Sequence, residues 1–165
     1  MKKALFFINS SIPIYPGGNT AGGVEVFVAT LATALANIGW TCDIVASKDS
    51  KSYISGVNII PLNVDSTVLK MRNGHTASFD WKYYMELTKS LNVDSYDLIH
   101  VDNHYLPLLK YLNDNVSSKK IVNYYQILPR WSDCRQYATE AQKMENVYNL
   151  AISDLIKSKW GELGI

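Results

Sequence analysis

The pattern of apolar positions along the chain alternates between short continuous runs and longer stretches with helical spacing. Ala4 to Ile8 contains five apolar residues in succession, which is typical of a parallel strand buried on both faces. Pro61 is expected to break a later strand, because proline cannot donate to a ladder. Apolar or β-branched runs predict further strands at 42–46, 57–62, 97–101, 121–125 and 150–153.

Helical spacing separates most of these strands. After the first strand, apolar residues recur at three- and four-residue intervals, with Glu25, Thr33 and Asn37 expected off the apolar face. Gly39 is placed to end this helix at the C′ position. The apolar face comprises Val24, Phe27, Val28, Leu31, Ala32 and Leu35. Later helices are predicted from Asp80 (Trp81, Tyr84, Met85, Thr88, Leu91), over 106–112 with Pro107 in the first turn, through Tyr137, Ala141, Met144 and Val147, and from Asp154 (Leu155, Ile156, Trp160, Leu163).

This alternation predicts one domain of the α/β class. Its sheet is expected to be doubly wound and mainly parallel, with right-handed crossovers and helices on both faces. A length of 165 residues suits one such domain with a sizeable core. The polar segment 63–78 is interpreted as an excursion at a rim of the sheet. Ligands of such sheets bind beyond the carboxyl ends of the strands, so the residues that follow each strand are the candidates for function.

Composition narrows the class of partner. The net charge is +1 and 47% of residues are hydrophobic, so no basic face points to nucleic acid. Ala4 to Ile8 is too short for a signal-peptide core, and no run approaches a membrane span. Cys42 and Cys134 lack metal-ligand spacing, and a reduced, buried thiol is expected at Cys42. A cytoplasmic location is expected, with contact at the inner face of the membrane as an option.

A glycine-rich turn, Pro16 to Gly23, joins the first strand to the first helix. Gly22 and Gly23 lack β-carbons, so a phosphate or sugar could approach the main chain and the N–H groups that open the helix. No lysine follows the glycine pair and the spacing is not G-x-G-x-x-G, which excludes a Walker-type loop and a dinucleotide fingerprint. The alternative is a turn that simply requires positive φ.

The context of this turn resembles the opening of family-four GT-B glycosyltransferases. That family shows a Gly-Gly-x-Glu start, a Leu-Ala-x-x-Leu helix and a Gly-His-x-Val strand start, and Trp40 replaces the usual histidine here. Matching stretches continue in the same order and cover essentially the whole chain: Gly22-Gly23-Val24-Glu25, Leu31-Ala32, Leu35-Ala36, Gly39-Trp40, Tyr96 to Val101, and Ala151-Ile152-Ser153-Asp154 through Leu163-Gly164-Ile165.

The resemblance implies that the chain is the N-terminal, acceptor-binding domain of a nucleotide-sugar-dependent glycosyltransferase. By analogy with that family, Gly22 and Gly23 of this chain would contact the diphosphate of a UDP- or GDP-sugar donor. A C-terminal domain with a paired-glutamate motif holds the rest of the donor, and residues 1–165 are expected to lack it and to be inactive alone. Retention of configuration, no essential metal and no cofactor are implied. The acceptor would be a sugar or glycolipid.

The resemblance also nominates residues after the fourth and fifth strands. Gln126 stands where many relatives have a histidine beside the reacting sugar, and glutamine cannot transfer a proton near neutral pH. Either the leaving phosphate serves as the base and the change is tolerated, or the protein is impaired. Asp102, Asn103 and His104 would bind acceptor hydroxyls, although capping of the next helix by Asp102 or Asn103 explains them equally well.

Other polar residues carry weaker hypotheses. Arg130 and Trp131 could pair with phosphate and stack on a sugar, or could anchor an exposed loop. His100 is expected to be a hydrogen-bonded histidine within the sheet, and His75 a less favoured acceptor contact. Around the last helix, Lys157, Lys159 and Trp160 are assigned to a solvated face with one core tryptophan rather than to a membrane contact.

The sequence is also compatible with two other functions. One is a non-catalytic flavodoxin-like or receiver-type binding module. Asn9-Ser10-Ser11 after the first strand argues against a receiver, which carries acidic residues there, and a flavin would colour the purified protein yellow. The other is half of a GT-B nucleotide-sugar epimerase, for which the presence of a paired-glutamate motif downstream would decide.

Overall fold

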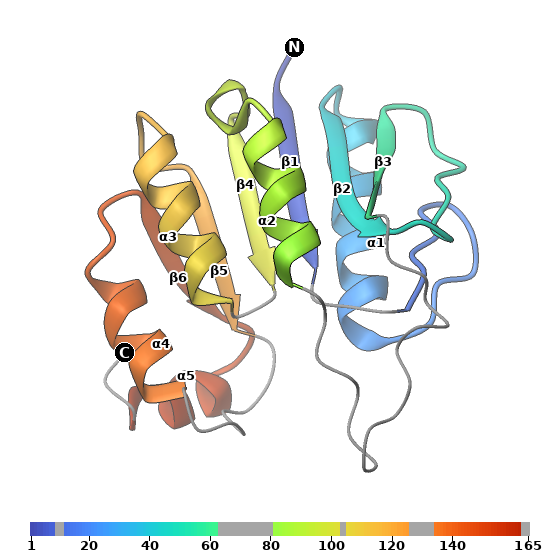
Figure 1. The fold of residues 1–165 in the computed structure, drawn as a ribbon. Coiled ribbons are helices and arrows are strands. Elements are labelled where there is room, and N and C mark those ends of the chain that lie inside the picture. Colours follow the sequence, from blue (N-terminus) through green and yellow to red (C-terminus); the bar gives the residue numbers. More distant parts are fainter. Residues whose placement is uncertain (9–11, 63–80, 103–104, 126–133, 163–165) are drawn as a thin grey trace.

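The computed structural model describes residues 1–8, 12–62, 81–102, 105–125 and 134–162, with the side chains of 81–83 excluded. Within these ranges the chain forms a six-stranded, all-parallel sheet in the order β3-β2-β1-β4-β5-β6 (Figure 1). The strands are β1 Lys3–Ile8, β2 Thr41–Ser47, β3 Val57–Leu62, β4 Leu98–Asp102, β5 Ile121–Tyr125 and β6 Val147–Ala151. The helices are α1 Gly23–Asn37, α2 Trp81–Ser90, the 3₁₀ turn η2 Val93–Ser95, α3 Leu106–Asn115, α4 Cys134–Gln142 and α5 Asp154–Gly161.

The order of the strands reverses at β1 and β4. The chain moves outward from β1 through β2 to β3, then crosses back to β4 and continues outward to β6. Helix α1 lies on one side of the sheet, while α2 and α3 lie on the other (Figure 1). This arrangement confirms the predicted doubly wound α/β fold. It also places a topological switch point between β1 and β4, which is where ligands bind in open sheets of this kind.

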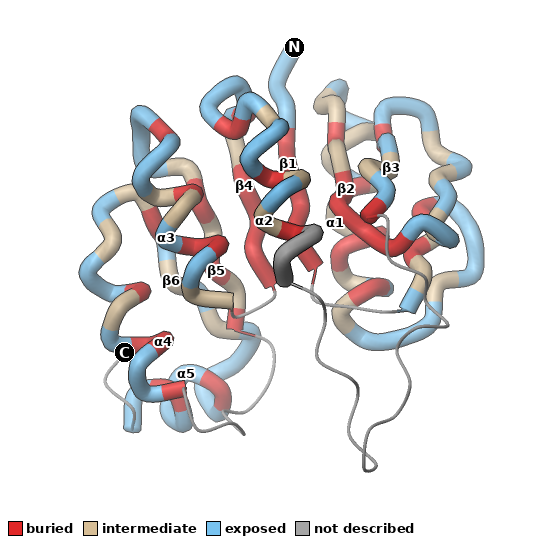
Figure 2. Tube along the Cα trace, viewed as in Figure 1, coloured by how far each residue is buried: buried red, intermediate tan, exposed pale blue. Residues whose placement is uncertain are grey.

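Strand β1 supplies both hydrophobic cores of the domain. Leu5 and Phe7 pack into the larger core on the side of α2 and α3, whereas Ala4, Phe6 and Ile8 pack beneath α1. All five side chains are fully buried, and the central strands are the most continuously buried part of the trace (Figure 2). The unbroken apolar run at the start of the sequence therefore reflects burial on both faces, as predicted.

Helix α1 has the predicted apolar face and the predicted end. All six apolar residues expected on that face belong to the core beneath the helix. At the C-terminus, Gly39 has a φ of 87° and donates its N–H to the carbonyl of Ala36 at 2.9 Å, while Trp40 donates to Leu35 at 3.1 Å. These two bonds form a Schellman motif, so Gly39 occupies the C′ position. Trp40 is partly buried against the same core, as a packing residue would be.

Three boundary predictions were wrong. Pro61 does not break β3, because β3 is an edge strand and Pro61 pairs in register with Ala46 while remaining exposed. The sixth strand is Val147–Ala151 rather than 150–153, so Val147 belongs to the strand and not to the preceding helix. Helix α5 is capped by Ser153, whose Oγ accepts the N–H of Ile156 at 3.3 Å, and not by Asp154.

Helix α5 is anchored by one aromatic side chain. Trp160 is 1% exposed, and its ring centroid lies 4.5 Å from that of Tyr125. Leu155, predicted on the buried face, is 62% exposed. Lys157 and Lys159 are exposed, and Lys159 forms an ion pair with Glu162 at 2.7 Å. Trp160 is therefore a core residue, which confirms the favoured interpretation of this helix.

Two further predictions concern the thiols and the membrane. Cys42 and Cys134 are both free and buried, and burial raises the pKa of the Cys42 thiol to about 11. The Cys42 thiol is therefore not ionised near neutral pH. None of the helices in the described ranges is long and apolar enough to span a membrane.

Candidate functional site

The candidate site lies at the carboxyl edge of β1, β4 and β5. These three strands are neighbours in the sheet and run parallel, so the segments that follow them leave the sheet at the same edge. Gly22, Gly23 and Asp102 belong to the described residues. Six other candidate residues lie outside the described ranges: Asn103, His104, Gln126, Arg130, Trp131 and His75. Asp80 and Leu163, which were predicted to belong to helices, also lie outside them.

Gly22 is the N-cap of α1, and the backbone requires glycine there on two grounds. Its φ is 87° with ψ at 142°, a conformation that L side chains rarely adopt. A β-carbon at Gly22 would also lie 2.0 Å from Oε2 of Glu25. The carbonyl of Gly22 accepts the N–H of Val26 at 3.0 Å, which is the first bond of the helix. The requirement for positive φ therefore explains Gly22 without any ligand.

Gly23 is different, although it is the next residue. It is the first residue of α1 and is exposed, and its φ is not positive. A β-carbon built on Gly23 would meet no atom within 4 Å. Neither backbone conformation nor packing in the described structure requires glycine at this position. The open space beside Gly23 leaves room for another group to approach the main chain.

Glu25 lies off the apolar face of α1, as expected, but its side chain is buried. Its side chain is 5% exposed, and its carboxylate folds back over the α-carbon of Gly22. A carboxylate in the first turn interacts favourably with the positive end of the helix dipole. The N-terminus of α1 therefore already carries a negative charge of its own, which offsets its attraction for a second anion.

The two glycines are expected to respond differently to alanine. Gly22→Ala should lower the free energy of unfolding by about 1–3 kcal/mol, because the side chain meets both an unfavourable φ and the Glu25 carboxylate. Gly23→Ala should leave stability unchanged or raise it by up to about 1 kcal/mol, since alanine is the better helix former. Urea unfolding of both variants measures this difference. Equal stabilities would contradict the assignment of strain to Gly22.

Asp102 is the last residue of β4 and is 4% exposed. It pairs in register with Ile8 of β1, so it stands beside the switch point. Helix α3 begins at Leu106 with Tyr105 at the N-cap and without a side-chain cap. The N-cap position of α3 is therefore occupied by Tyr105, three residues after Asp102. A role in binding hydroxyl groups remains open to it.

Tyr124 is a site residue that the sequence analysis did not nominate. It lies on the same sheet face as Asp102 and is partly buried. Its ring stacks on Phe27 of α1, with centroids 5.0 Å apart and planes 14° apart. Burial and the charge of Asp102 raise the pKa of the Tyr124 phenol. The phenol therefore stays protonated near neutral pH and can donate a hydrogen bond. Alternation along β5 was the signal that could have identified it.

His100 is buried beneath α1, as predicted, but without the predicted hydrogen bond at Nε2. It is 3% exposed, and Nε2 has no partner. The rings of Phe6 and Tyr124 surround it, with centroids 5.6 and 5.4 Å away. Burial lowers the pKa of His100 to about 4, so the imidazole is neutral at physiological pH. A neutral, enclosed imidazole does not act at the edge of the sheet.

Buried hydrogen bonds tie β5 and β6 to α4 behind this edge. Asn123 accepts the hydroxyl of Tyr137 at 2.5 Å and donates to Oδ1 of Asn149 at 2.8 Å. Asn149 in turn donates to the carbonyl of Ala141 at 3.2 Å. On the other side of the switch point, the hydroxyl of Tyr84 donates to the carbonyl of Ile8. These bonds fix the ends of the strands that carry the candidate site.

Comparison with known proteins finds a family match and a similar solved structure. The family model described as Glycosyltransferase Family 4 matches residues 21–125, from the glycine turn through the end of β5. No curated protein matches the chain. Among solved structures, the sucrose-phosphate synthase (tll1590) from Thermosynechococcus elongatus is similar at 12% sequence identity and a TM-score of 0.43, covering 92% of this chain. This chain spans 48% of that protein's length. The family model matches well over half of the residues, and the chain belongs to Glycosyltransferase Family 4.

Proposed function

We propose that this domain binds the acceptor, and one side of the donor diphosphate, in a nucleotide-sugar-dependent glycosyltransferase. The family match over residues 21–125 carries the proposal, because it extends over both segments that flank the switch point. The donor is a UDP- or GDP-sugar and acts as a co-substrate. The proposed reaction needs no resident cofactor or metal and retains the anomeric configuration.

Gly23 is the proposed point of contact with the diphosphate. Its open position allows a phosphate oxygen to reach the N–H groups of the first helical turn. Negative charge builds on the diphosphate as the sugar leaves, and backbone donors fixed at that point stabilise it. Because the Glu25 carboxylate already occupies the helix terminus, cationic groups must supply much of the attraction. Arg130 and the donor-binding domain are the proposed sources.

Asp102 and Tyr124 are the proposed acceptor contacts among the described residues. A carboxylate accepts hydrogen bonds from sugar hydroxyls, and the protonated phenol can donate one. Asn103, His104 and Gln126 follow the same strands and are proposed to complete the acceptor site. Since Gln126 cannot take a proton, the leaving phosphate is the proposed base. Lys157 and Lys159 are exposed cations available for contact with a membrane-bound acceptor.

Catalysis also requires the rest of the donor site. Transfer needs donor and acceptor held together in a reactive geometry. We therefore propose that a second domain, in the same polypeptide or in another subunit, supplies the nucleotide and sugar contacts. Residues 1–165 on their own should bind nucleotide weakly and catalyse no transfer.

Nucleotide titration followed by amide chemical shifts tests this proposal directly. UDP, GDP, UDP-glucose and GDP-mannose are added to the ¹⁵N-labelled 165-residue chain, and the expected shifts centre on Gly22, Gly23 and Glu25. Inorganic phosphate serves as the control for nonspecific anion binding. Shifts confined to other parts of the domain would contradict the assignment. Yellow colour and flavin absorbance in the purified protein would favour the flavodoxin-like alternative.

The charge of Glu25 provides a second prediction. Glu25→Gln should tighten UDP binding roughly fivefold, or by about 1 kcal/mol, because it removes a like charge beside the proposed diphosphate position. Glu145→Gln is the matched control, since Glu145 is exposed and precedes β6 at the opposite edge of the sheet. Isothermal titration at low ionic strength measures both variants. Weaker binding by Glu25→Gln would place the diphosphate elsewhere.

A further inference from the structure

Two loops beside the outer half of the sheet are joined into one scaffold by hydrogen bonds. Lys51 donates its N–H to the carbonyl of Ile14 at 3.1 Å, and Tyr53 donates to Pro16 at 2.9 Å. Ile14 in turn donates to the hydroxyl of Ser50 at 3.0 Å. The segment before α1 is therefore held against the segment between β2 and β3, and its shape does not depend on the glycine pair at 22–23.

A tight turn fixes the centre of this scaffold. Gly18 donates to the carbonyl of Tyr15 at 2.8 Å, with Pro16 and Gly17 between them and a φ of 78° at Gly17. This is the pattern of a type II turn, with proline at the second position and glycine at the third. A β-carbon on Gly17 would lie 2.7 Å from Ile54, and one on Gly18 would lie 3.1 Å from the ring of Tyr53.

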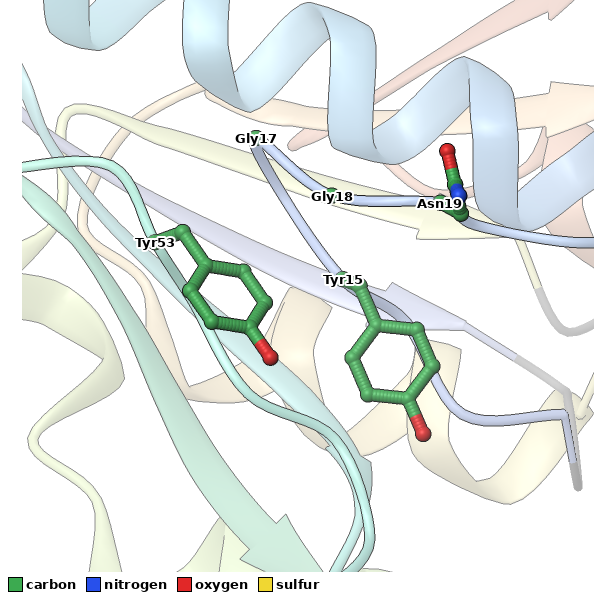
Figure 3. Close-up of a pocket in the computed structure, with 5 residues that line it drawn as sticks. All are labelled: Tyr15, Gly17, Gly18, Asn19 and Tyr53. Atoms are coloured by element: carbon green, nitrogen blue, oxygen red, sulfur yellow. The ribbon is translucent and has the colours of Figure 1, made fainter.

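The turn and the second loop border an open surface hollow of about 410 Å³. Its lining residues are Tyr15, Gly17, Gly18, Asn19 and Tyr53 (Figure 3). Both tyrosine rings extend from the backbone in the same direction. Tyr53 is 59% exposed, and the ammonium of Lys51 lies 5.2 Å from its ring centroid. An open hollow flanked by aromatic rings offers apolar surface on which one face of a ligand can pack while its other face stays in solvent.

The hollow continues over the turn toward α1. A second hollow, of about 240 Å³, shares Tyr15, Gly17 and Gly18 with the first and extends along the helix to Thr30 and Thr33. Thr33 lies in the C-terminal half of α1, about three turns from Gly22 at its N-terminus. The groove therefore runs away from the carboxyl edge that carries the candidate catalytic site.

The lining of the groove suits a neutral sugar better than a phosphate. The N–H of Tyr15 donates to Thr20 at 2.9 Å, and those of Gly18 and Tyr53 are engaged within the scaffold. Among the described residues that line the two hollows there is no cation, and the ammonium of Lys51 beside them lies over the ring of Tyr53. What remains available is two aromatic surfaces, two phenol hydroxyls and the amide of Asn19. Amphipathic rings of this kind pack against an apolar face and bind hydroxyls at their edge.

We infer that this groove is a second carbohydrate-binding site, which holds a neutral sugar unit of the acceptor chain at a distance from the catalytic edge. The inference rests on the proposed function, because only a glycosyltransferase domain gives a reason for a glycan to be present. Tyr53 and Tyr15 stack on the sugar rings, and Asn19 binds their hydroxyls. An acceptor of several sugar units would be bound both in this groove and at the carboxyl edge of the sheet.

Saccharide titration of the ¹⁵N-labelled chain tests the inference. Maltotriose, mannotriose and chitotriose are the probes, and at least one should shift the amides of Tyr15, Gly18, Asn19 and Tyr53. Tyr53→Ala should weaken that binding about tenfold. Tyr148→Ala is the matched control, because Tyr148 is 48% exposed and has Lys119 over its ring at 4.5 Å, yet lines neither hollow. It should leave the affinity unchanged.

The outcomes separate this inference from the proposed function. If UDP shifts Gly23 but no trisaccharide shifts the groove amides, the second site is excluded and the proposed function stands. Equal loss of affinity in Tyr53→Ala and Tyr148→Ala would also overturn the inference. If trisaccharides bind in the groove while nucleotides do not bind at all, the groove stands and the proposed donor contact fails. Circular dichroism of each variant confirms that the fold is retained.

Discussion

Replacing Gly23 by leucine is expected to lower nucleotide-sugar-dependent transfer by about a hundredfold while leaving the fold intact. The leucine side chain would project from a helical position whose β-carbon meets no described atom, into the space assigned to the diphosphate. It would displace the donor from the N–H groups of the first turn. Leucine is also a better helix former than glycine, so stability should be equal or higher. The measurement is kcat/KM in the protein assembled with its donor-binding domain.

Ala34→Leu is the control for this prediction. Ala34 is an exposed residue of the same helix, more than two turns further along, so leucine there adds apolar surface away from the proposed site. Activity should be unchanged in this variant. If Gly23→Leu retains full activity, the diphosphate does not contact the main chain at the start of α1. If it unfolds, the position is closed by packing and the open space around Gly23 is not a ligand site.

The architecture could be predicted from sequence because the apolar runs that mark the individual strands were consistent with one fold. An unbroken apolar run at Ala4 to Ile8 requires burial on both faces, and a parallel sheet with helices on both sides provides it. The errors occurred where a residue satisfied two patterns. Val147 continues a helical spacing and also starts a strand, and only its pairing with Ile121 decides between them. Pro61 is acceptable because β3 is at the edge, which is a property of the whole sheet.

The site was less predictable than the fold, because its chemistry depends on side-chain direction. Sequence identified the glycine pair but could not separate Gly22, whose φ demands glycine, from Gly23, whose surroundings are open. Helical periodicity placed Glu25 off the apolar face but could not show that the side chain folds back over Gly22. Tyr124 became a candidate only when register placed it beside His100 and Asp102. The first two facts are details of local conformation, and the third depends on contacts between strands that are distant in sequence.

His100 lies between the core beneath α1 and the carboxyl edge of the sheet, and its burial has a thermodynamic consequence. His100, Asp102 and Tyr124 lie on the same face of the sheet. Phe27 of α1 packs over both His100 and Tyr124. An imidazole with an unpartnered Nε2 in this position is tolerated only while it is neutral. Protonation of His100 is therefore expected to weaken the packing of α1 over this face of the sheet.

Acidification is expected to destabilise the domain through His100. The pKa of histidine is about 6.5 in the unfolded chain and about 4 in the folded domain. Between these two pH values the unfolded state therefore binds one more proton than the folded state. The contribution of His100 to the free energy of unfolding is fully present above pH 6.5. As the pH falls toward 4, up to about 3 kcal/mol of it is lost. His100→Leu should remove this component, so the difference in unfolding free energy between the two proteins should change by about 1.4 kcal/mol per pH unit in that window. Urea unfolding at half-unit steps from pH 4 to 8 measures it, and carboxylates common to both proteins cancel in the difference. A difference that stays constant across the window would show that His100 keeps an ordinary pKa, and that α1 packs independently of its protonation.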